Sequence, residues 1–170
     1  MAAGQAGRLG LTLCPGKYDH NDQSGAWDGN LDTDLSAVLD WGASAVVTLM
    51  EMHELELLRV PDLGERVSRM GLRWWHLPIV DGGVPNRHFE HAWNRAGENL
   101  RRRLMAGEGV VIHCRGGLGR TGIVAARLLV EFGEDPENAL FRVRRCRTGT
   151  VENWLQEEYV RDLMEVQGIF

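Results

Sequence analysis

The chain has 170 residues, of which 44% are hydrophobic and 25% charged, and its formal net charge is −5. This length and composition predict a single folded domain over residues 1–170 and argue against a disordered chain, while the negative balance gives no support for nucleic acid as a partner. Three widely spaced cysteines without metal-ligand spacing, no recognisable leader peptide and no apolar run of membrane-spanning length favour a cytoplasmic protein without a membrane partner.

The first half of the chain alternates apolar runs with helical patterns. The apolar runs predict strands at Arg8–Leu13, Ser44–Met50 and Leu72–Leu77. Between the first two strands we expect a polar surface loop, Lys17–Asn30, and then a helix that is capped within Asp32–Asp34 and ends near Gly42. An acidic turn, Glu51–Glu54, and a short helix from Pro61 to Met70 complete this half.

The second half adds one strand and four helices. A loop, Pro78–Pro85, precedes a long amphipathic helix, Asn86–Gly107, whose apolar face is predicted to be Phe89, Trp93, Ala96, Leu100 and Leu104. A buried strand ends at Cys114, a helix begins at about Arg120, and two further helices are expected at Asp135–Arg147 and Asn153–Val166. The basic residues of 142–147 are interpreted as a solvated helix face, with a docking surface for an acidic partner as the alternative. The alternation predicts an α/β fold with a short central sheet flanked by helices on both faces.

The segment between the last strand and its helix carries the chemistry. It holds Cys114, then Arg115-Gly116-Gly117-Leu118-Gly119, then Arg120 and Thr121. Glycines let backbone N–H groups converge on one point, and a helix N-terminus adds partial positive charge, so this loop predicts an anion cradle. A thiol at the start of such a loop should ionise readily and act as a nucleophile. Arg120 can supply a planar pair of donors to phosphate oxygens.

This loop resembles the His-Cys-x5-Arg-Ser/Thr signature of the cysteine-dependent protein tyrosine and dual-specificity phosphatases, and within that family especially the kinase-associated phosphatases. The resemblance implies a protein tyrosine phosphatase-like fold. It also implies hydrolysis of phosphotyrosine, phosphoserine or phosphothreonine in a protein partner, through a cysteinyl-phosphate on Cys114, with His113 orienting the loop. The phosphate is expected to be bound by Arg115, Gly116, Gly117, Leu118, Gly119 and Arg120. No metal and no other cofactor is implied.

Such a reaction also needs a proton for the leaving oxygen and, later, a base for water. Asp81 follows a predicted strand, as Cys114 does, and two glycines after it would let the loop move, so it is the candidate acid and base. The matching Pro-Ile-x-Asp-Gly-Gly-x-Pro stretch of the kinase-associated phosphatases supports that role. The hydroxyl of Thr121 can donate to the cysteine sulfur as it leaves. The family's water-positioning glutamine matches Gln156 alone, because Glu152 stands where the first Gln of a Gln-x-x-x-Gln pattern would be.

Two other classes of protein use comparable loops. One is a phosphate-binding module without turnover, and the other is a rhodanese-like or arsenate-reductase-like enzyme; the joint presence of Cys114, Arg120 and Asp81 favours the phosphatase. The absence of lysine from the loop disfavours a phosphoinositide substrate. The sequence leaves open the physiological substrate, the preference among phosphorylated residues and the oligomeric state. It also leaves open whether Cys14 or Cys146 pairs with Cys114 on oxidation.

Overall fold

One parallel sheet lies at the centre of the protein. The computed structural model describes residues 6–22 and 25–164. The strands of the sheet lie in the order β1 (Arg8–Thr12), β6 (Gly109–His113), β4 (Ala43–Thr48) and β5 (Arg73–His76). Every neighbouring pair runs parallel. β6 is buried along its whole length, as expected for an inner strand covered on both faces.

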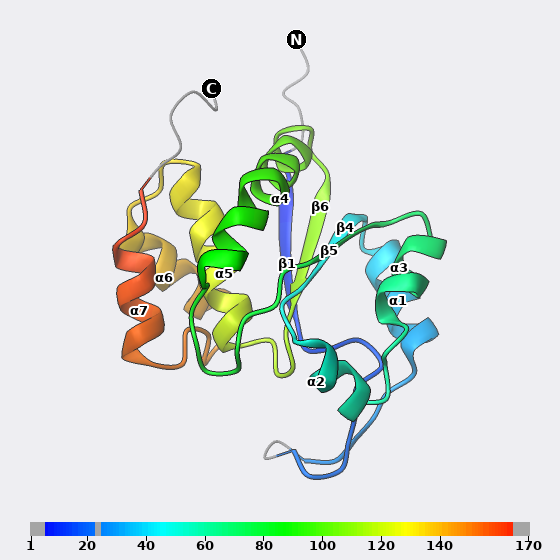
Figure 1. The fold of residues 1–170 in the computed structure, drawn as a ribbon. Coiled ribbons are helices and arrows are strands. Elements are labelled where there is room, and N and C mark those ends of the chain that lie inside the picture. The colour runs from blue at the N-terminus through cyan, green and yellow to red at the C-terminus, as the bar shows by residue number, and fades with distance from the viewer. Residues whose placement is uncertain (1–5, 23–24, 165–170) are drawn as a thin grey trace.

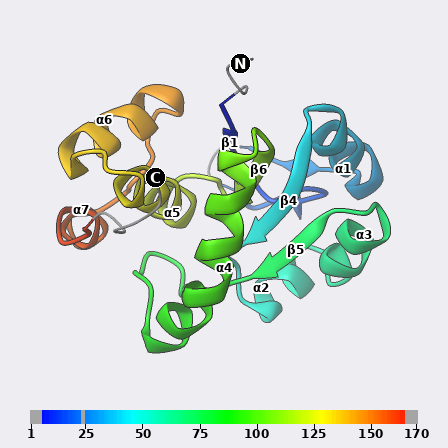
Figure 2. The same ribbon diagram turned by 90° about the horizontal axis from the view of Figure 1, so that it is seen from above.

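Helices cover both faces of this sheet (Figures 1 and 2). One face carries α1 (Leu31–Asp40) and α3 (Leu63–Arg69), and the other carries α4 (Arg87–Met105), α5 (Gly119–Glu131), α6 (Pro136–Cys146) and α7 (Trp154–Arg161). The predicted α/β architecture is therefore confirmed, and the predicted apolar face of α4 is buried at all its positions. None of the helices within the described residues is long and apolar enough to cross a bilayer.

The helix boundaries differ from the predicted ones by a few residues. α1 begins at Leu31 because the side chain of Asn30 accepts a hydrogen bond from the Thr33 amide at 3.0 Å. The cap was predicted within Asp32–Asp34 instead, because Asn, Asp and Thr all favour that position. α7 ends at Arg161, whereas its predicted end, Val166, lies outside the described residues.

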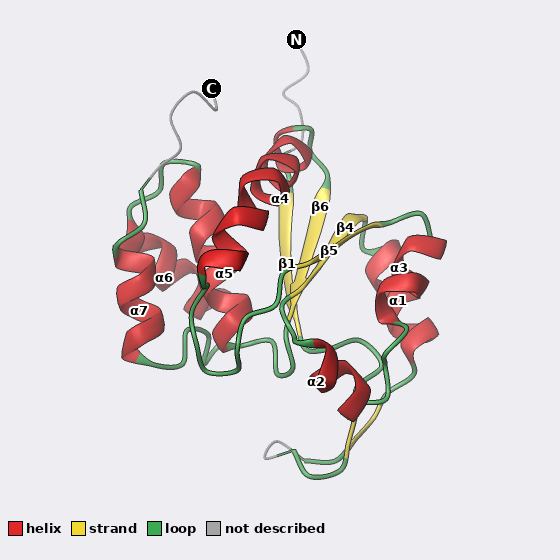
Figure 3. Cartoon of the chain, viewed as in Figure 1, coloured by secondary structure: helices red, strands yellow, loops and turns green. Residues whose placement is uncertain are grey.

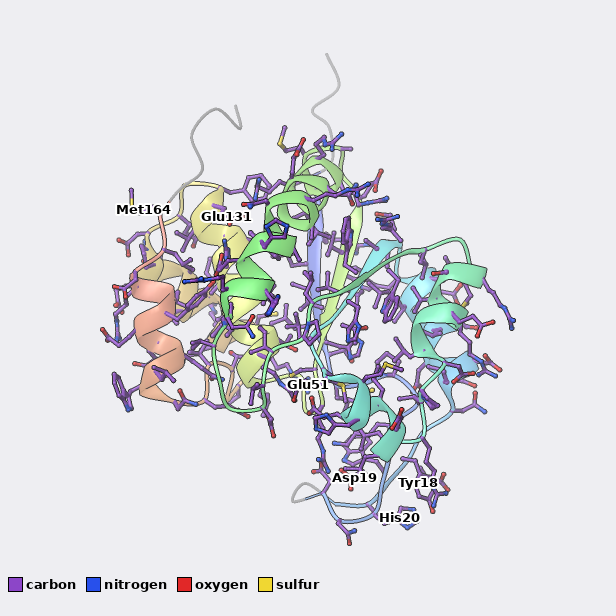
Figure 4. The ribbon with its side chains drawn as sticks, viewed as in Figure 1. Tyr18, Asp19, His20, Glu51, Glu131 and Met164 are labelled. Carbon is purple, nitrogen blue, oxygen red and sulfur yellow. The ribbon has the colours of Figure 1, made fainter. Side chains whose placement is uncertain are left out.

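Two segments expected to be irregular are regular. The predicted loop Lys17–Asn30 contains an antiparallel hairpin, β2 (Tyr18–Asp19) with β3 (Trp27–Asp28), and the predicted acidic turn is the start of α2 (Met52–Leu57). The segment lies mostly at the surface, as predicted, but it contains a short hairpin, and two of its polar side chains are buried, with Lys17 2% exposed and Asp19 7% exposed. Figure 4 shows Tyr18, Asp19 and His20 on this hairpin, which projects beyond α2.

The carboxyl ends of the four strands are level. The register aligns Thr12 with His113, His113 with Thr48, and Thr48 with His76. The loops that follow these strands therefore leave the sheet at one edge, the lower edge in Figure 3, where α2 also lies. In open parallel sheets this edge is where ligands bind.

Candidate active site

The predicted cysteine loop lies at this edge, between β6 and α5. We call residues 114–120 the anion loop. Cys114 is 3% exposed and Thr121 is fully buried beside it. The Thr121 hydroxyl donates to the Cys114 sulfur at 3.1 Å. The predicted strand, loop and helix are confirmed, and they bring the candidate nucleophile and the candidate donor to its sulfur into contact.

The carbonyl groups of residues 115–118 all bond to groups outside the loop. Their donors are the Cys14 amide to Arg115 at 3.2 Å, and the Arg147 guanidinium to Gly116 at 3.1 Å and to Gly117 at 2.9 Å. The Leu118 carbonyl accepts from the Gly122 amide at 2.9 Å and from the Val151 amide at 3.3 Å. Among the described residues no peptide bond is cis, and in a trans peptide the N–H points opposite to the C=O. The amides of residues 116–119 therefore turn away from these partners, toward the concave side of the loop. This is the geometry of an anion cradle.

Gly117 is the position of the anion loop where only glycine fits. Its φ is +72°, and a Cβ there would lie 2.4 Å from the Thr12 carbonyl. Both the left-handed backbone and the close approach to β1 exclude a side chain. Gly116, by contrast, has open space around its Cα. The two neighbouring glycines thus have different structural roles.

Arg120 is held in place by Glu54, a residue that the sequence analysis did not single out. The guanidinium is 2% exposed, and its two terminal nitrogens donate to the two Glu54 oxygens at 2.7 Å and 2.9 Å. The first nitrogen also donates to the Ile79 carbonyl at 3.0 Å. Burial alone would raise the pKa of Glu54, but the hydrogen bonds and charge of Arg120 keep it below its usual value. Glu54 stays ionised and fixes the plane of the guanidinium.

The loop that carries Asp81, residues 78–85, reaches the same arginine; we call it the acid loop. An Asp81 carboxylate oxygen lies 3.3 Å from Nη2 of Arg120, and the Asp81 side chain is 69% exposed. Two side chains of the α7 N-terminus hold the acid loop. Asn153 donates to the Gly82 carbonyl at 2.9 Å, and Gln156 donates to the Gly83 carbonyl at 3.2 Å.

Gln156, the predicted water-positioning residue, is fully buried. Its amide nitrogen holds the acid loop, and its amide oxygen accepts from the Glu152 amide at 2.8 Å. In this conformation Gln156 therefore braces α7 against the acid loop, and one amide hydrogen remains for a water. Glu152 lies beside Gly119, where its flexible carboxylate would have to shift to make room for a Cβ. Burial and the nearby charge of Asp81 raise the pKa of Glu152.

Two buried residues, His113 and Cys14, lie close to the candidate nucleophile, Cys114. The His113 ring is fully buried and bonds through Nδ1 to the Cys114 carbonyl at 3.3 Å. Burial lowers the pKa of His113 to about 4, so the ring is neutral at physiological pH. Burial raises the pKa of Cys14 to about 12, and Cys14 and Cys114 are near enough to interact electrostatically. Cys146, by contrast, is exposed on α6.

Arg115 connects the anion loop to the projecting hairpin. Its guanidinium is ion-paired with the buried carboxylate of Asp19, and its Nε donates to Asp19 at 3.2 Å. Burial opposes the charge of Asp19, but the hydrogen bonds from Arg115 keep the Asp19 pKa below its usual value. Arg115 was predicted to bind phosphate, but its side chain is paired with Asp19 of the hairpin. Only the backbone of Arg115 belongs to the anion loop.

Other concave features do not coincide with these residues. A cavity of about 660 Å³ lies between β1, α1 and the hairpin, with Leu11, Trp27 and Trp41 among its lining residues. It shares no lining residue with the anion loop, so the apolar cavity and the anion cradle are separate features. Within residues 6–22 and 25–164, no cluster of three or more His, Cys, Asp or Glu side chains is placed to hold a metal ion.

The structure thus brings most of the predicted residues together. Thr121 meets Cys114, Asp81 meets Arg120, and His113 bonds to the Cys114 backbone. Glu54, Arg147 and Asn153 were not predicted from the sequence as residues of the site. One signal was available for Glu54, because a buried arginine must have an acidic partner and an acidic segment follows the neighbouring strand. Arg147 was interpreted as part of a solvated face, which is wrong, since its guanidinium bonds to two carbonyls of the anion loop.

Comparison with known proteins agrees with this geometry. A family model described as "Polymorphic toxin system, DSP-PTPase phosphatase" matches residues 26–134. The chain belongs to this phosphatase family. The chain is also 30% identical, over 139 residues, to rat cyclin-dependent kinase inhibitor 3, a match that covers 80% of the chain. The match spans 64% of the length of that relative, slightly less than two thirds.

Solved structures of phosphatases share the fold of this chain. Kinase associated phosphatase, with its catalytic-site cysteine replaced by serine, superposes with a TM-score of 0.78 at 29% identity, over 89% of this chain and 83% of that one. Tk-PTP in its active form superposes with a TM-score of 0.68 at 26% identity, over 96% and 97% of the two chains. The predicted protein tyrosine phosphatase-like fold is therefore confirmed.

Proposed function

We propose that this phosphatase hydrolyses phosphomonoesters of phosphotyrosine, phosphoserine or phosphothreonine in proteins, through a cysteinyl-phosphate on Cys114. The observation that carries the proposal is the set of outward carbonyls at residues 115–118, which leaves a ring of amides facing the same space as a buried thiol and Arg120. A thiol beside converging donors can attack a phosphoryl group, because the donors stabilise the charge on its oxygens.

In the first step the thiolate of Cys114 attacks phosphorus, and the bond from phosphorus to the leaving oxygen breaks. Arg120 has five N–H donors. Glu54 and Ile79 engage three of them, which leaves Nε–H and the Nη2–H that faces Asp81 for a phosphate. The equatorial oxygens are bound by this guanidinium and by the loop amides, while Asp81 gives its proton to the leaving oxygen.

In the second step water attacks the phosphorus of the cysteinyl-phosphate, and the sulfur–phosphorus bond breaks. The Asp81 carboxylate, which has lost its proton, takes one from the water. The Thr121 hydroxyl, 3.1 Å from the sulfur, stabilises the thiolate as it leaves. The products are an alcohol or phenol and inorganic phosphate, and the protein returns to its starting state.

A phosphoprotein is the substrate class that we propose. The matches to kinase associated phosphatase and to cyclin-dependent kinase inhibitor 3 support it. So does the loop composition, because residues 115–119 contain one arginine and no lysine, and that arginine is committed to Asp19. A lipid headgroup with several phosphates would find little positive charge there.

The three cysteines are free, which supports the cytoplasm as the proposed location.

The test is hydrolysis of p-nitrophenyl phosphate in EDTA by wild type, Cys114→Ser and Asp81→Asn, with Cys146→Ser as the control for loss of a thiol. We expect Cys146→Ser to match wild type, and Cys114→Ser to lose activity by about a thousandfold or more. Asp81→Asn should lose about a hundredfold. Acid quenching of Asp81→Asn should trap phosphate on Cys114. Turnover by Cys114→Ser would refute the mechanism. An inert wild type that vanadate still stabilises would favour a binding module.

A further inference from the structure

A chain of hydrogen bonds crosses three adjacent strands and ends at the nucleophile. The Trp74 indole N–H, on β5, donates to the Thr48 hydroxyl oxygen, on β4, at 2.8 Å. The same oxygen lies 2.7 Å from Nε2 of His113, on β6. The other ring nitrogen of His113 lies 3.3 Å from the Cys114 carbonyl oxygen. Thr48 and His113 are both fully buried, so water does not compete for these bonds.

The chemistry of the groups decides which atom donates and which accepts in each of these hydrogen bonds. The Cys114 carbonyl can only accept, so Nδ1 of His113 must carry the proton to bond with it. The ring is neutral, because burial lowers the His113 pKa to about 4, and Nε2 is then an acceptor. The Thr48 hydroxyl therefore donates to Nε2. Since the indole N–H can only donate, Trp74 supplies the bond that Thr48 accepts, and each donor points toward the nucleophile.

We propose that Thr48 and Trp74 are positioning residues that hold the His113 ring in place through Nε2, with its proton on Nδ1, and thereby orient the Cys114 peptide. The inference rests on the proposed phosphatase function and deepens it. The Cys114 carbonyl precedes the four outward carbonyls of residues 115–118. His113 holds this fifth carbonyl outward as well, so the Arg115 amide turns toward the cradle like the amides that follow it.

Two further observations indicate that this series of hydrogen bonds is a stable feature of the fold. The indole ring of Trp74 packs against Gly64 on α3, where a Cβ would lie 2.3 Å from the ring. Thr48 is β-branched and therefore stiff at χ1, which holds its hydroxyl between the two partners. Arg120 and His76 also oppose a positive charge on His113. The ring thus stays neutral through the pH range in which the proposed reaction would run.

The test combines activity with the ¹⁵N spectrum of the His113 imidazole. The variants are Thr48→Val, which keeps the shape and removes the hydroxyl, Thr48→Ser, which restores it, and Trp74→Phe. Trp75→Phe is the matched control, because the neighbouring indole donates to Asn99 on α4 instead. We expect Nδ1–H in wild type and in the Trp75→Phe and Thr48→Ser variants. In Thr48→Val the proton should stay on Nδ1, facing the Cys114 carbonyl, but Nε2 loses its hydrogen-bond donor, so the ¹⁵N resonance of Nε2 should move downfield toward that of an unbonded ring nitrogen. In the same variant kcat should fall about fivefold to tenfold with KM unchanged.

The order of the effects is part of the prediction. Trp74→Phe leaves the Thr48 hydroxyl free to donate to His113, so its loss in kcat should be smaller than that of Thr48→Val. An Nε2–H tautomer in wild type would overturn the proposal, and so would a Thr48→Val variant whose Nε2 resonance matches that of wild type, whatever its activity. If wild type hydrolyses no phosphomonoester, the proposed function fails. The wild-type spectrum still decides the tautomer.

Discussion

Replacing Glu54 by glutamine removes the negative charge that faces the guanidinium of Arg120 and leaves the shape of the side chain unchanged. In the native protein the carboxylate accepts two hydrogen bonds from Arg120, and both groups are almost fully buried. A glutamine can accept one of these bonds through its oxygen, but its NH₂ group would face the second nitrogen of the arginine. The variant therefore contains a buried cation without its principal counter-charge.

The size of the effect follows from the remaining partners of Arg120. Breaking a buried ion pair by removing one partner costs about 3 to 5 kcal/mol. Asp81 lies 3.3 Å from the guanidinium, but it is 69% exposed and its attraction is screened by solvent. We therefore expect Glu54→Gln to lower the free energy of unfolding by about 3 kcal/mol. For a chain of this size that corresponds to a fall in Tm of about 6 to 12 °C.

The dependence on pH has a defined sign. The pKa of Glu54 is lower in the folded protein than its usual value of 4.5, so ionised Glu54 stabilises the folded state above that pH. This stabilisation is lost as the pH falls through the lowered pKa of the folded state. The difference in stability between wild type and Glu54→Gln should be full at pH 7 and should shrink below pH 4.5.

Urea unfolding at pH 7, 5, 4 and 3 measures this difference. Glu56→Gln is the matched control, because Glu56 lies on the same helix, α2, and its side chain is exposed. That change should stay within about 0.5 kcal/mol of wild type. Equal stability of Glu54→Gln and wild type at pH 7 would refute the reasoning. A difference that does not shrink in acid would assign the effect to packing instead of charge.

The remaining predictions concern the anion loop and its surroundings. Arg147→Met removes the donors to two loop carbonyls, so kcat/KM for p-nitrophenyl phosphate should fall about tenfold; Arg145→Met, on an exposed neighbour, should leave it unchanged. Gly117→Ala should lower Tm by several degrees in a thermal melt, because of its positive φ and its contact with β1, whereas Gly116→Ala should be tolerated. Cys14, buried and with its pKa raised to about 12, should resist iodoacetamide up to about pH 9 by mass spectrometry, while the exposed cysteine of α6 is labelled. Labelling of Cys14 at the rate of an exposed thiol would contradict this.

The local part of the site was predictable because its residues are neighbours in sequence. The strand, the glycines, Cys114 and Thr121 lie within one short segment, and the left-handed Gly117 and the helix N-terminus are properties of that segment. The pairing of Asp81 with Arg120 was predictable for a different reason. Parallel strands end at one edge, so two loops that follow strands must meet there.

The rest depended on contacts between distant residues. Glu54 and Arg120 are separated by 66 positions, and Arg147 reaches the anion loop across about 30 positions. Polarity was also a poor guide to exposure. The segment that holds Asp19 was predicted as a surface loop, yet its carboxylate is buried because Arg115 neutralises it. Pattern alone does not distinguish a solvated charge from one that has a buried partner.

One segment, residues 147–156, contacts both loops of the candidate site, and it is strained. Arg147 and the Val151 amide hold the carbonyls of the anion loop, while Asn153 and Gln156 hold those of the acid loop. Val151 has φ +59°, which is unfavourable for a β-branched residue and costs on the order of 1 to 3 kcal/mol. Such a conformation persists only where surrounding contacts over-determine it, and here the buried side chain and the amide bond of Val151 do so. Because these contacts come from a single segment, a shift of this segment would move the acid and the cradle together. This segment therefore contributes to the separation between the two loops, together with the direct hydrogen bond from Arg120 to the Ile79 carbonyl.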